Sequence, residues 1–198
     1  MKLKRGLSTS MPVPYPAASG VTTMEKSYIK MRGYRIEDHI TYLSTGETET
    51  REYTDNKMVK SVLTLIMMAL RGDEVARISY WAIGTGSSAW DSAPVNPSVD
   101  ETHLTKEIGR KYIEPEDMVY LDPETFEESS TPTSCVQVTV TFNENECNGL
   151  WREFGLFGGD ATEEKDSGIM IDKKHHEFIH KTDDMVIERV IRFNIAFA

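Results

Sequence analysis

The stretch CVQVTVTF, residues 135–142, alternates apolar and polar side chains without interruption. One face carries the apolar residues Val136, Val138, Val140 and Phe142. The other face carries Gln137, Thr139 and Thr141. A two-residue period is typical of a half-buried antiparallel strand, because one face packs on a core while the other meets water. The sequence therefore predicts at least one antiparallel sheet.

Other strand patterns lie on both sides of this stretch. Residues 76–86, ARISYWAIGTG, are rich in β-branched and aromatic side chains and end in glycines. Residues 185–197, MVIERVIRFNIAF, place one row of side chains on a single face: Ile187, Arg189, Ile191, Phe193, Ile195 and Phe197. Residues 103–113 fit a short helix or a strand, and residues 24–56 give no clear pattern. Four or five strands after one helix predict a mainly β (α+β) fold, an antiparallel β-sandwich or barrel. We expect the sandwich, with one buried helix and an extended N-terminal arm.

The helix is expected over about residues 55–71. Thr54 or Asp55 can cap its start, and Gly72 stands where a left-handed C-terminal residue belongs. Its apolar residues follow the helical spacing: Met58, Val59, Val62, Leu63, Ile66, Met67 and Leu70. Leu65, Met68 and Ala69 widen this face. The pattern therefore predicts a helix that is covered on more than one side.

The stretch LWREFGLFGG, residues 150–159, combines large apolar side chains with an Arg–Glu pair and glycines. In a regular strand its residues divide into two apolar rows, as expected of a strand buried on both faces. Trp151, Glu153, Gly155 and Phe157 form one row; Leu150, Arg152, Phe154 and Leu156 form the other. Gly155 leaves room for a bulge or a close backbone approach, and Gly158–Gly159 can turn the chain. We therefore predict a structural corner at Trp151, Glu153, Gly155, Leu156, Phe157, Gly158 and Gly159.

Glu153 has an apolar setting in this corner. A buried carboxylate needs a partner, and we expect Arg110, Arg189 or a backbone N–H.

Charge is distributed unevenly along the chain. The net charge is −10, but residues 1–35 carry +6, which leaves −16 for the rest. Residues 1–24 contain prolines and small polar residues, so we expect an extended arm before a single domain at residues 25–198. The basic residues Lys2, Lys4 and Arg5 are candidates for an assembly contact in which one subunit's arm lies on the acidic face of another. A merely solvated tail fits the charge equally well. The acidic body argues against nucleic-acid binding.

Several candidate sites are weak. The segment HHEFIH holds His175, His176 and His180, but in a strand His176 and His180 share a face about 13 Å apart, too far for one metal ion. We therefore expect polar histidines on a strand face. The acidic loop at residues 160–166 lacks the order of an EF-hand, and the RGD sequence at residues 71–73 is a helix end. GTGSSAW, residues 84–90, is a weak phosphate motif.

The remaining composition narrows the class of protein. Cys135 and Cys147 are read as free thiols of a reducing cytoplasm, with a disulfide as the alternative. No apolar run approaches the roughly 20 residues of a membrane span, and no signal peptide is expected. We find no catalytic set, and we expect no enzyme activity, metal or cofactor.

An ordered series of segments resembles bacteriophage tail proteins associated with the baseplate or tail fibres. YWAIGTGSSAW (residues 80–90) comes first, and THLTKEIGRKYI (residues 102–113) is similar to the family's L.NE..R segment. VQVTVTF then precedes WREFGLFGGDA (residues 151–161), which is similar to the family's E.GLF element. DSGIMI and HKTDDMVIERVIRFNIAF close the series, although ERVIRF stands where an aromatic residue is commoner. The resemblance covers about residues 76–198, and residues 1–75 match nothing.

The resemblance implies a virion structural protein with a β-sandwich fold that works in multiple copies. Its partners would be copies of itself and other tail or baseplate proteins, in a virion assembled from chains made in the host cytoplasm. We expect a tail or baseplate subunit or a fibre adaptor; a collar or neck component is an alternative. A second alternative is a carbohydrate-binding receptor module that stacks sugars on Trp90 and Tyr120. A third is a metal-dependent hydrolase that uses the three histidines.

Overall fold

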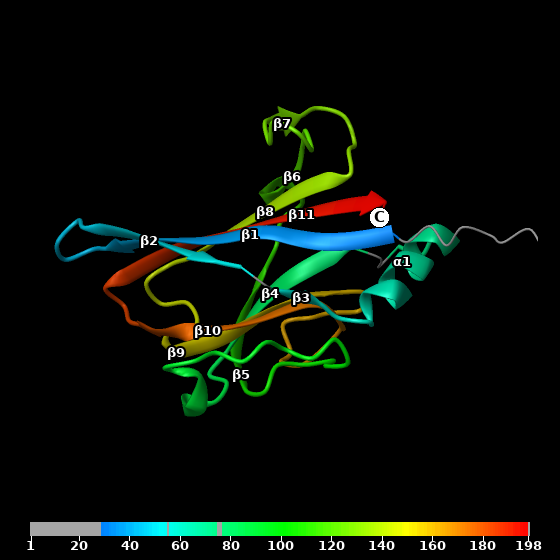
Figure 1. The fold of residues 1–198 in the computed structure, drawn as a ribbon. Coiled ribbons are helices and arrows are strands. Elements are labelled where there is room, and N and C mark those ends of the chain that lie inside the picture. The colour runs from blue at the N-terminus through cyan, green and yellow to red at the C-terminus, as the bar shows by residue number, and fades with distance from the viewer. Residues whose placement is uncertain (1–28, 55, 75–76, 198) are drawn as a thin grey trace, which may run out of the picture.

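Two antiparallel β-sheets face each other in the computed structural model, which describes residues 29–54, 56–74 and 77–197 (Figure 1). The first sheet has the order β2 (Thr48–Tyr53), β1 (Ile29–Tyr42), β11 (Met185–Phe197), β8 (Cys135–Phe142), β6 (Met118–Leu121) and β7 (Glu128–Ser129). The second has the order β3 (Lys57–Met58), β10 (Ile169–Lys181), β9 (Gly149–Gly158), β4 (Ile78–Gly84) and β5 (Glu107–Tyr112). The helix α1 (Val62–Arg71) and two short 3-10 helices, η1 (Ser88–Trp90) and η2 (Pro115–Asp117), complete the elements. The predicted mainly antiparallel β-sandwich with one helix is confirmed.

The first sheet follows the predicted alternation closely. Val138, Val140 and Phe142 of β8 are buried, whereas the polar residues between them are only half-buried. β11 lies between β1 and β8 and contributes Ile187 and Ile191 to the core. Their side chains pack against those of the second sheet, so the main core lies between the two layers.

The predicted apolar face of β11 ends earlier than expected. Asn194 is the last residue of β11 that pairs with β8, and Ile195 beyond it is exposed. Ile195 therefore does not join the buried row.

The second sheet is buried on both faces. Trp81, Ile83 and Phe154 point into the main core. The alternate residues form a second apolar cluster with a residue of the long loop at 91–106: Val59, Tyr80, Ala82, Leu104, Phe157 and Met170. Because this loop covers the outer face, polar side chains of β9 and β10 that point outward are also buried.

The helix differs from the prediction in its start and its burial. Lys57 and Met58 pair with β10 as β3, and α1 begins only at Val62, because the chain must first cross the edge of the second sheet. Gly72 adopts the predicted left-handed conformation, with φ of 87°. Asp55 lies outside the described residues, and Ser61 occupies the N-cap position. The expectation of a helix covered on more than one side is wrong for the described residues: the side chains of Val62 and Leu65 are buried, but the opposite face is exposed.

Two ambiguous segments form strands. Residues 107–112 are β5, so the strand alternative to a short helix is the observed one. Residues 29–53, which gave no clear pattern, contain the long strand β1 and its hairpin partner β2.

Candidate functional site

β9, which carries most of the predicted corner, lies in the second sheet between β10 and β4. Every residue from Trp151 to Gly159 is buried. The predicted two rows hold from Glu153 to Phe157 but fail at Trp151, which joins Phe154 and Leu156 in the main core. β10 shifts its register opposite this point, between His175 and Ile179, and the irregular pairing turns Trp151 inward. Trp151 is therefore on the opposite face from Phe157, contrary to the prediction.

The glycines of the corner fit close to other backbone atoms. A Cβ atom on Gly158 would lie 2.2 Å from the carbonyl oxygen of Arg77, and one on Gly155 would lie 3.0 Å from that of Asp172. Gly159 has φ of 68° at the turn after β9. The predicted close approach at Gly155 and the predicted turn at Gly158–Gly159 are both observed.

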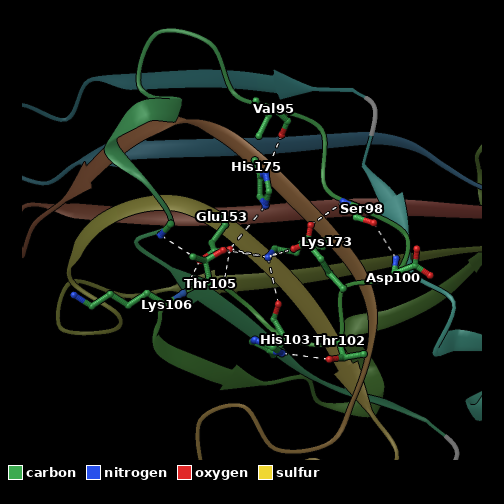
Figure 2. Close-up of polar contacts among 12 residues, drawn as sticks. Val95, Ser98, Asp100, Thr102, His103, Thr105, Lys106, Glu153, Lys173 and His175 are labelled. Atoms are coloured by element: carbon green, nitrogen blue, oxygen red, sulfur yellow. Dashed lines mark hydrogen bonds and ion pairs between the residues drawn. The ribbon is translucent and has the colours of Figure 1, made fainter.

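Glu153 is fully buried at the centre of a polar cluster on the outer face of β9 (Figure 2). Its carboxylate accepts hydrogen bonds from the backbone N–H groups of Gly86 at 3.1 Å, Thr105 at 3.0 Å and Lys106 at 2.9 Å. Lys173 Nζ lies 3.1 Å from Glu153 Oε2. The predicted backbone partner is therefore confirmed, whereas Arg110 and Arg189 pair with other carboxylates.

Lys173 connects the same cluster to the middle of the long loop. Its ammonium group binds the carboxylate of Glu101, the carbonyl oxygen of His103 at 3.2 Å and Thr105 Oγ1 at 3.4 Å. Burial alone would raise the pKa of Glu101, but hydrogen bonds from Lys173 and from the Ser98 N–H outweigh it and lower this pKa. Glu153 and Lys173 together therefore fix the loop at several points of its backbone.

His175 completes the cluster. Its Nδ1 lies 2.8 Å from the carbonyl oxygen of Val95, which can only accept, so Nδ1 carries the proton. Its ring stacks on Trp90 with centroids 3.8 Å apart, and its Nε2 is 4.0 Å from Glu153 Oε2. Burial lowers the pKa of His175, so the ring is neutral at pH 7.

The cluster contains the residue types of acid–base chemistry, but its geometry is that of a clamp. Both oxygens of Glu153 are engaged, since Oε1 accepts from Gly86 and Lys106 while Oε2 accepts from Thr105 and contacts Lys173. A carboxylate whose acceptor positions are filled by the protein has no position left for a substrate. The arrangement therefore stabilises one conformation of the whole connection between β4 and β5, residues 85–106, which includes the long loop at 91–106.

The histidines of β10 do not share a face. His176 is buried and its ring lies 5.2 Å from that of Tyr53, whereas His180 is exposed. The expectation of one common strand face is wrong because the register shift of β10 lies between His175 and Ile179. Burial and the nearby Arg189 lower the pKa of His176 to about 3. Among the described residues, no three His, Cys, Asp or Glu side chains are grouped as metal ligands.

A second buried ion pair lies in the main core. Arg189 of β11 binds Asp38 of β1 with both side chains fully buried, and Tyr53 donates to Asp38 at 2.9 Å. The guanidinium carbon of Arg189 lies 4.6 Å from the ring centre of Phe154. The sequence pattern places Arg189 on an apolar face but gives no sign of Asp38.

Hydrogen bonds with Glu107 and Arg110 of β5 fix the backbone of the acidic loop that follows β9. Arg110 and Glu107 of β5 form a buried ion pair, and Glu107 accepts from the Asp166 N–H at 3.0 Å. Arg110 also donates to the carbonyl oxygens of Thr162 at 2.9 Å and Ser167 at 3.1 Å. These contacts fix the backbone of the loop, and its carboxylates are not among any group of metal ligands in the described residues.

Other predicted positions are placed as follows. The side chain of Arg71 pairs with Asp73 just beyond the helix. Both cysteines are free thiols, as predicted, and burial raises the pKa of Cys147 to about 11. The described residues contain no helix long and apolar enough to span a membrane. Lys2, Lys4 and Arg5 lie outside the described residues.

The two aromatic residues predicted to stack on sugars are far apart in the fold. Trp90 packs on His175 of the second sheet, and Tyr120 is exposed on β6 of the first. They therefore form no shared platform.

The chain was compared with known protein families and with curated proteins. No family model matches it, and no curated protein has a similar sequence.

Proposed function

We propose that this protein is a virion structural protein, a subunit of a bacteriophage tail or baseplate or an adaptor for tail fibres. It acts by interlocking with neighbouring subunits. The ordered series of segments that resembles phage tail proteins supports the proposal from the sequence. From the structure, one observation carries it: an apolar stripe on α1 that faces away from the sandwich.

The stripe consists of Leu63, Met67 and Leu70, whose exposed fractions are 60%, 63% and 77%. The three residues follow the i, i+4, i+7 spacing of a single helix face. A shallow hollow of about 460 Å³ on α1 is lined by Met67 and Leu70 together with Thr64, Met68 and Arg71. Contiguous exposed apolar surface of this kind marks interaction sites, whereas isolated exposed apolar residues are common on any protein.

The position of α1 suits contact between subunits. The helix lies at one end of the sandwich and contacts β10 (Figure 1). A neighbour docked there would bury the stripe without covering the faces of either sheet. The buried clamp at Glu153 fits the same role, because a subunit that interlocks needs loops of fixed shape.

Labelling of virus particles tests this function. An antibody raised against the recombinant chain is expected to label tails or baseplates of particles from host cells that carry this gene. Mass spectrometry of the purified particles is expected to detect the chain in multiple copies per particle. Particles that form normally without the chain would refute the proposal.

A further inference from the structure

A groove of about 1190 Å³ lies between β2 of the first sheet and β10 of the second. The chain before α1 first pairs with β10, with Met58 opposite Asp172 and Lys57 opposite Lys173. The preceding strand, β2, belongs instead to the first sheet, where it is paired with β1. Beyond Lys173, the edge of β10 on this side has no partner strand among the described residues, and neither has the outer edge of β2. The groove is thus bordered by two strand edges.

Backbone acceptors point into this groove. Arg51 of β2 reaches across it and donates to the carbonyl oxygen of Phe178 at 3.4 Å. Lys174 of β10 reaches back and donates to the carbonyl oxygen of Thr54. Long side chains here bind carbonyl groups that a paired strand would otherwise bind. Such an edge can accept an added strand when the backbone N–H groups of the incoming segment replace the Arg51 and Lys174 side chains at these acceptors.

Two carboxylates of the groove have no cationic partner among the ion pairs of the described residues. Of the five that line it, Glu49 pairs with Arg51, Glu52 with Arg35 and Asp91 with Arg152, which leaves Glu177 and Asp184. Tyr42, Tyr53 and Phe178 add apolar surface. An incoming strand that matches this lining is basic on one face and apolar on the other.

Residues 1–7 of the chain, MKLKRGL, have this pattern. In a strand, Lys2 and Lys4 share one face, and Met1, Leu3 and Leu7 share the other, on which Arg5 adds a third cation. The segment contains no proline, since the first is Pro12, so proline removes none of its backbone N–H donors. We propose that residues 1–7 of one copy lie in the groove between β2 and β10 of a neighbouring copy as an added strand. This inference rests on the proposed function, because it names the partner surface through which copies interlock.

The groove and the start of the arm lie at opposite ends of β1. Residues 8–28 can span about 70 Å when extended, so the arm can reach its own groove or that of a neighbour, and the proposed assembly selects the neighbour. Tyr42 and Met185, which line the groove, are the paired residues at one end of β1 and β11. The arm joins β1 at Ile29, at the other end of this 14-residue strand, about 43 Å away for 13 steps of 3.3 Å. Copies stacked end to end would bring the arm of one subunit directly to the groove of the next. This contact is heterologous and builds a ring or a filament.

Disulfide trapping between full-length chains tests the proposal. One chain carries Leu3→Cys, and a chain with a different affinity tag carries Phe178→Cys or, as a second variant, His180→Cys; both target residues are exposed. Mild oxidation of the mixture is expected to give a cross-linked product that contains both tags. A partner chain with Tyr120→Cys, exposed on β6, is the matched control and is expected to give none. A mixture of the Leu3→Cys chain with the unsubstituted chain is a second control, because any cross-linked product in it comes from the native thiols of Cys135 and Cys147.

Charge reversal in the arm gives an independent readout. Lys2→Glu combined with Lys4→Glu is expected to reduce the cross-linked yield by roughly tenfold, the effect of losing two surface ion pairs. The reduction should be smaller at high salt, because exposed ion pairs are screened.

The outcomes separate this inference from the proposed function. A chain that carries both Leu3→Cys and Phe178→Cys can form the disulfide within itself or with a second chain. If only the disulfide within one chain forms, docking onto a neighbour is overturned. Absence of both products from chains that still assemble, as judged by sedimentation, overturns the groove and leaves the proposed function standing. Absence of assembly under all conditions overturns both.

Discussion

Glu153→Ala is expected to lower the free energy of unfolding by about 3–5 kcal/mol, the usual loss when one partner of a buried ion pair is removed. The carboxylate is fully buried, and it binds three backbone N–H groups as well as Lys173. Its loss leaves Lys173 with Glu101 as its remaining anionic partner and the three amides without acceptors. Each orphaned amide would cost about 1–3 kcal/mol if the space stayed dry. Water that enters the vacated space can bind them, so we do not add these terms to the total.

Urea unfolding followed by circular dichroism measures this loss, and thermal unfolding should show a decrease of about 10 °C for a domain of this size. Glu188→Ala is the matched control, because Glu188 is an exposed carboxylate in a strand. It is expected to change the free energy of unfolding by less than about 0.5 kcal/mol. Glu153→Gln keeps an acceptor but loses the charge, so its effect should lie between the two. A Glu153→Ala protein as stable as the Glu188→Ala protein would refute the clamp.

Three further predictions follow from the buried polar groups and the close backbone contacts. Burial raises the pKa of Asp172 from about 4 in the unfolded chain to about 8 in the folded protein. The folded protein therefore keeps this proton to higher pH than the unfolded chain, and wild-type stability falls as pH rises from about 4 to about 8. Asp172→Asn should therefore match the wild type near pH 4 and exceed it by about 2–5 kcal/mol at pH 8.5 in urea unfolding; a difference that does not change with pH would contradict this. Gly158→Ala should cost about 1–3 kcal/mol, because its Cβ would meet the Arg77 carbonyl oxygen at 2.2 Å, and an unchanged midpoint of thermal unfolding would contradict it. Asp38→Ala should cost about 3–5 kcal/mol by leaving Arg189 buried without its carboxylate, and the Asp38→Ala/Arg189→Met double variant should recover part of the loss; a double variant less stable than the single one would exclude this explanation.

Strand patterns were predictable where one periodic signal dominates. The alternation of β8 identifies a half-buried strand from eight residues alone, and Gly72 identifies the end of α1 because only its backbone conformation matters. The start of α1 was not predictable from local pattern. Lys57 and Met58 continue the helical spacing, but pairing with β10 takes precedence, and that contact joins segments far apart in the chain.

The partners of the buried polar residues were predictable only in part, for the same reason. The apolar neighbours of Glu153 predict its burial and its need for a partner, and of the three partners expected, Arg110, Arg189 or a backbone N–H, the backbone N–H is observed. Its cationic partner was missed because Lys173 stands in the run DKKHHE, which looks like a solvated strand surface. Lys173 and His175 of this run are buried under the loop at residues 91–106, whose position depends on tertiary packing such as that of Leu104 in one apolar cluster with Phe157. No periodicity within β10 carries that information.

Sedimentation velocity of the full-length chain tests most directly the claim that this protein works by assembling with its own copies. The measurement covers a wide range of concentrations and includes a Leu63→Ser/Met67→Ser/Leu70→Ser variant of the exposed stripe of α1. These substitutions replace only exposed side chains, so circular dichroism should show that the variant is folded. We predict that the wild type sediments above the monomer mass of 22.5 kDa with increasing concentration, and that the variant shifts toward it. A wild type that stays at 22.5 kDa throughout this range would contradict the account.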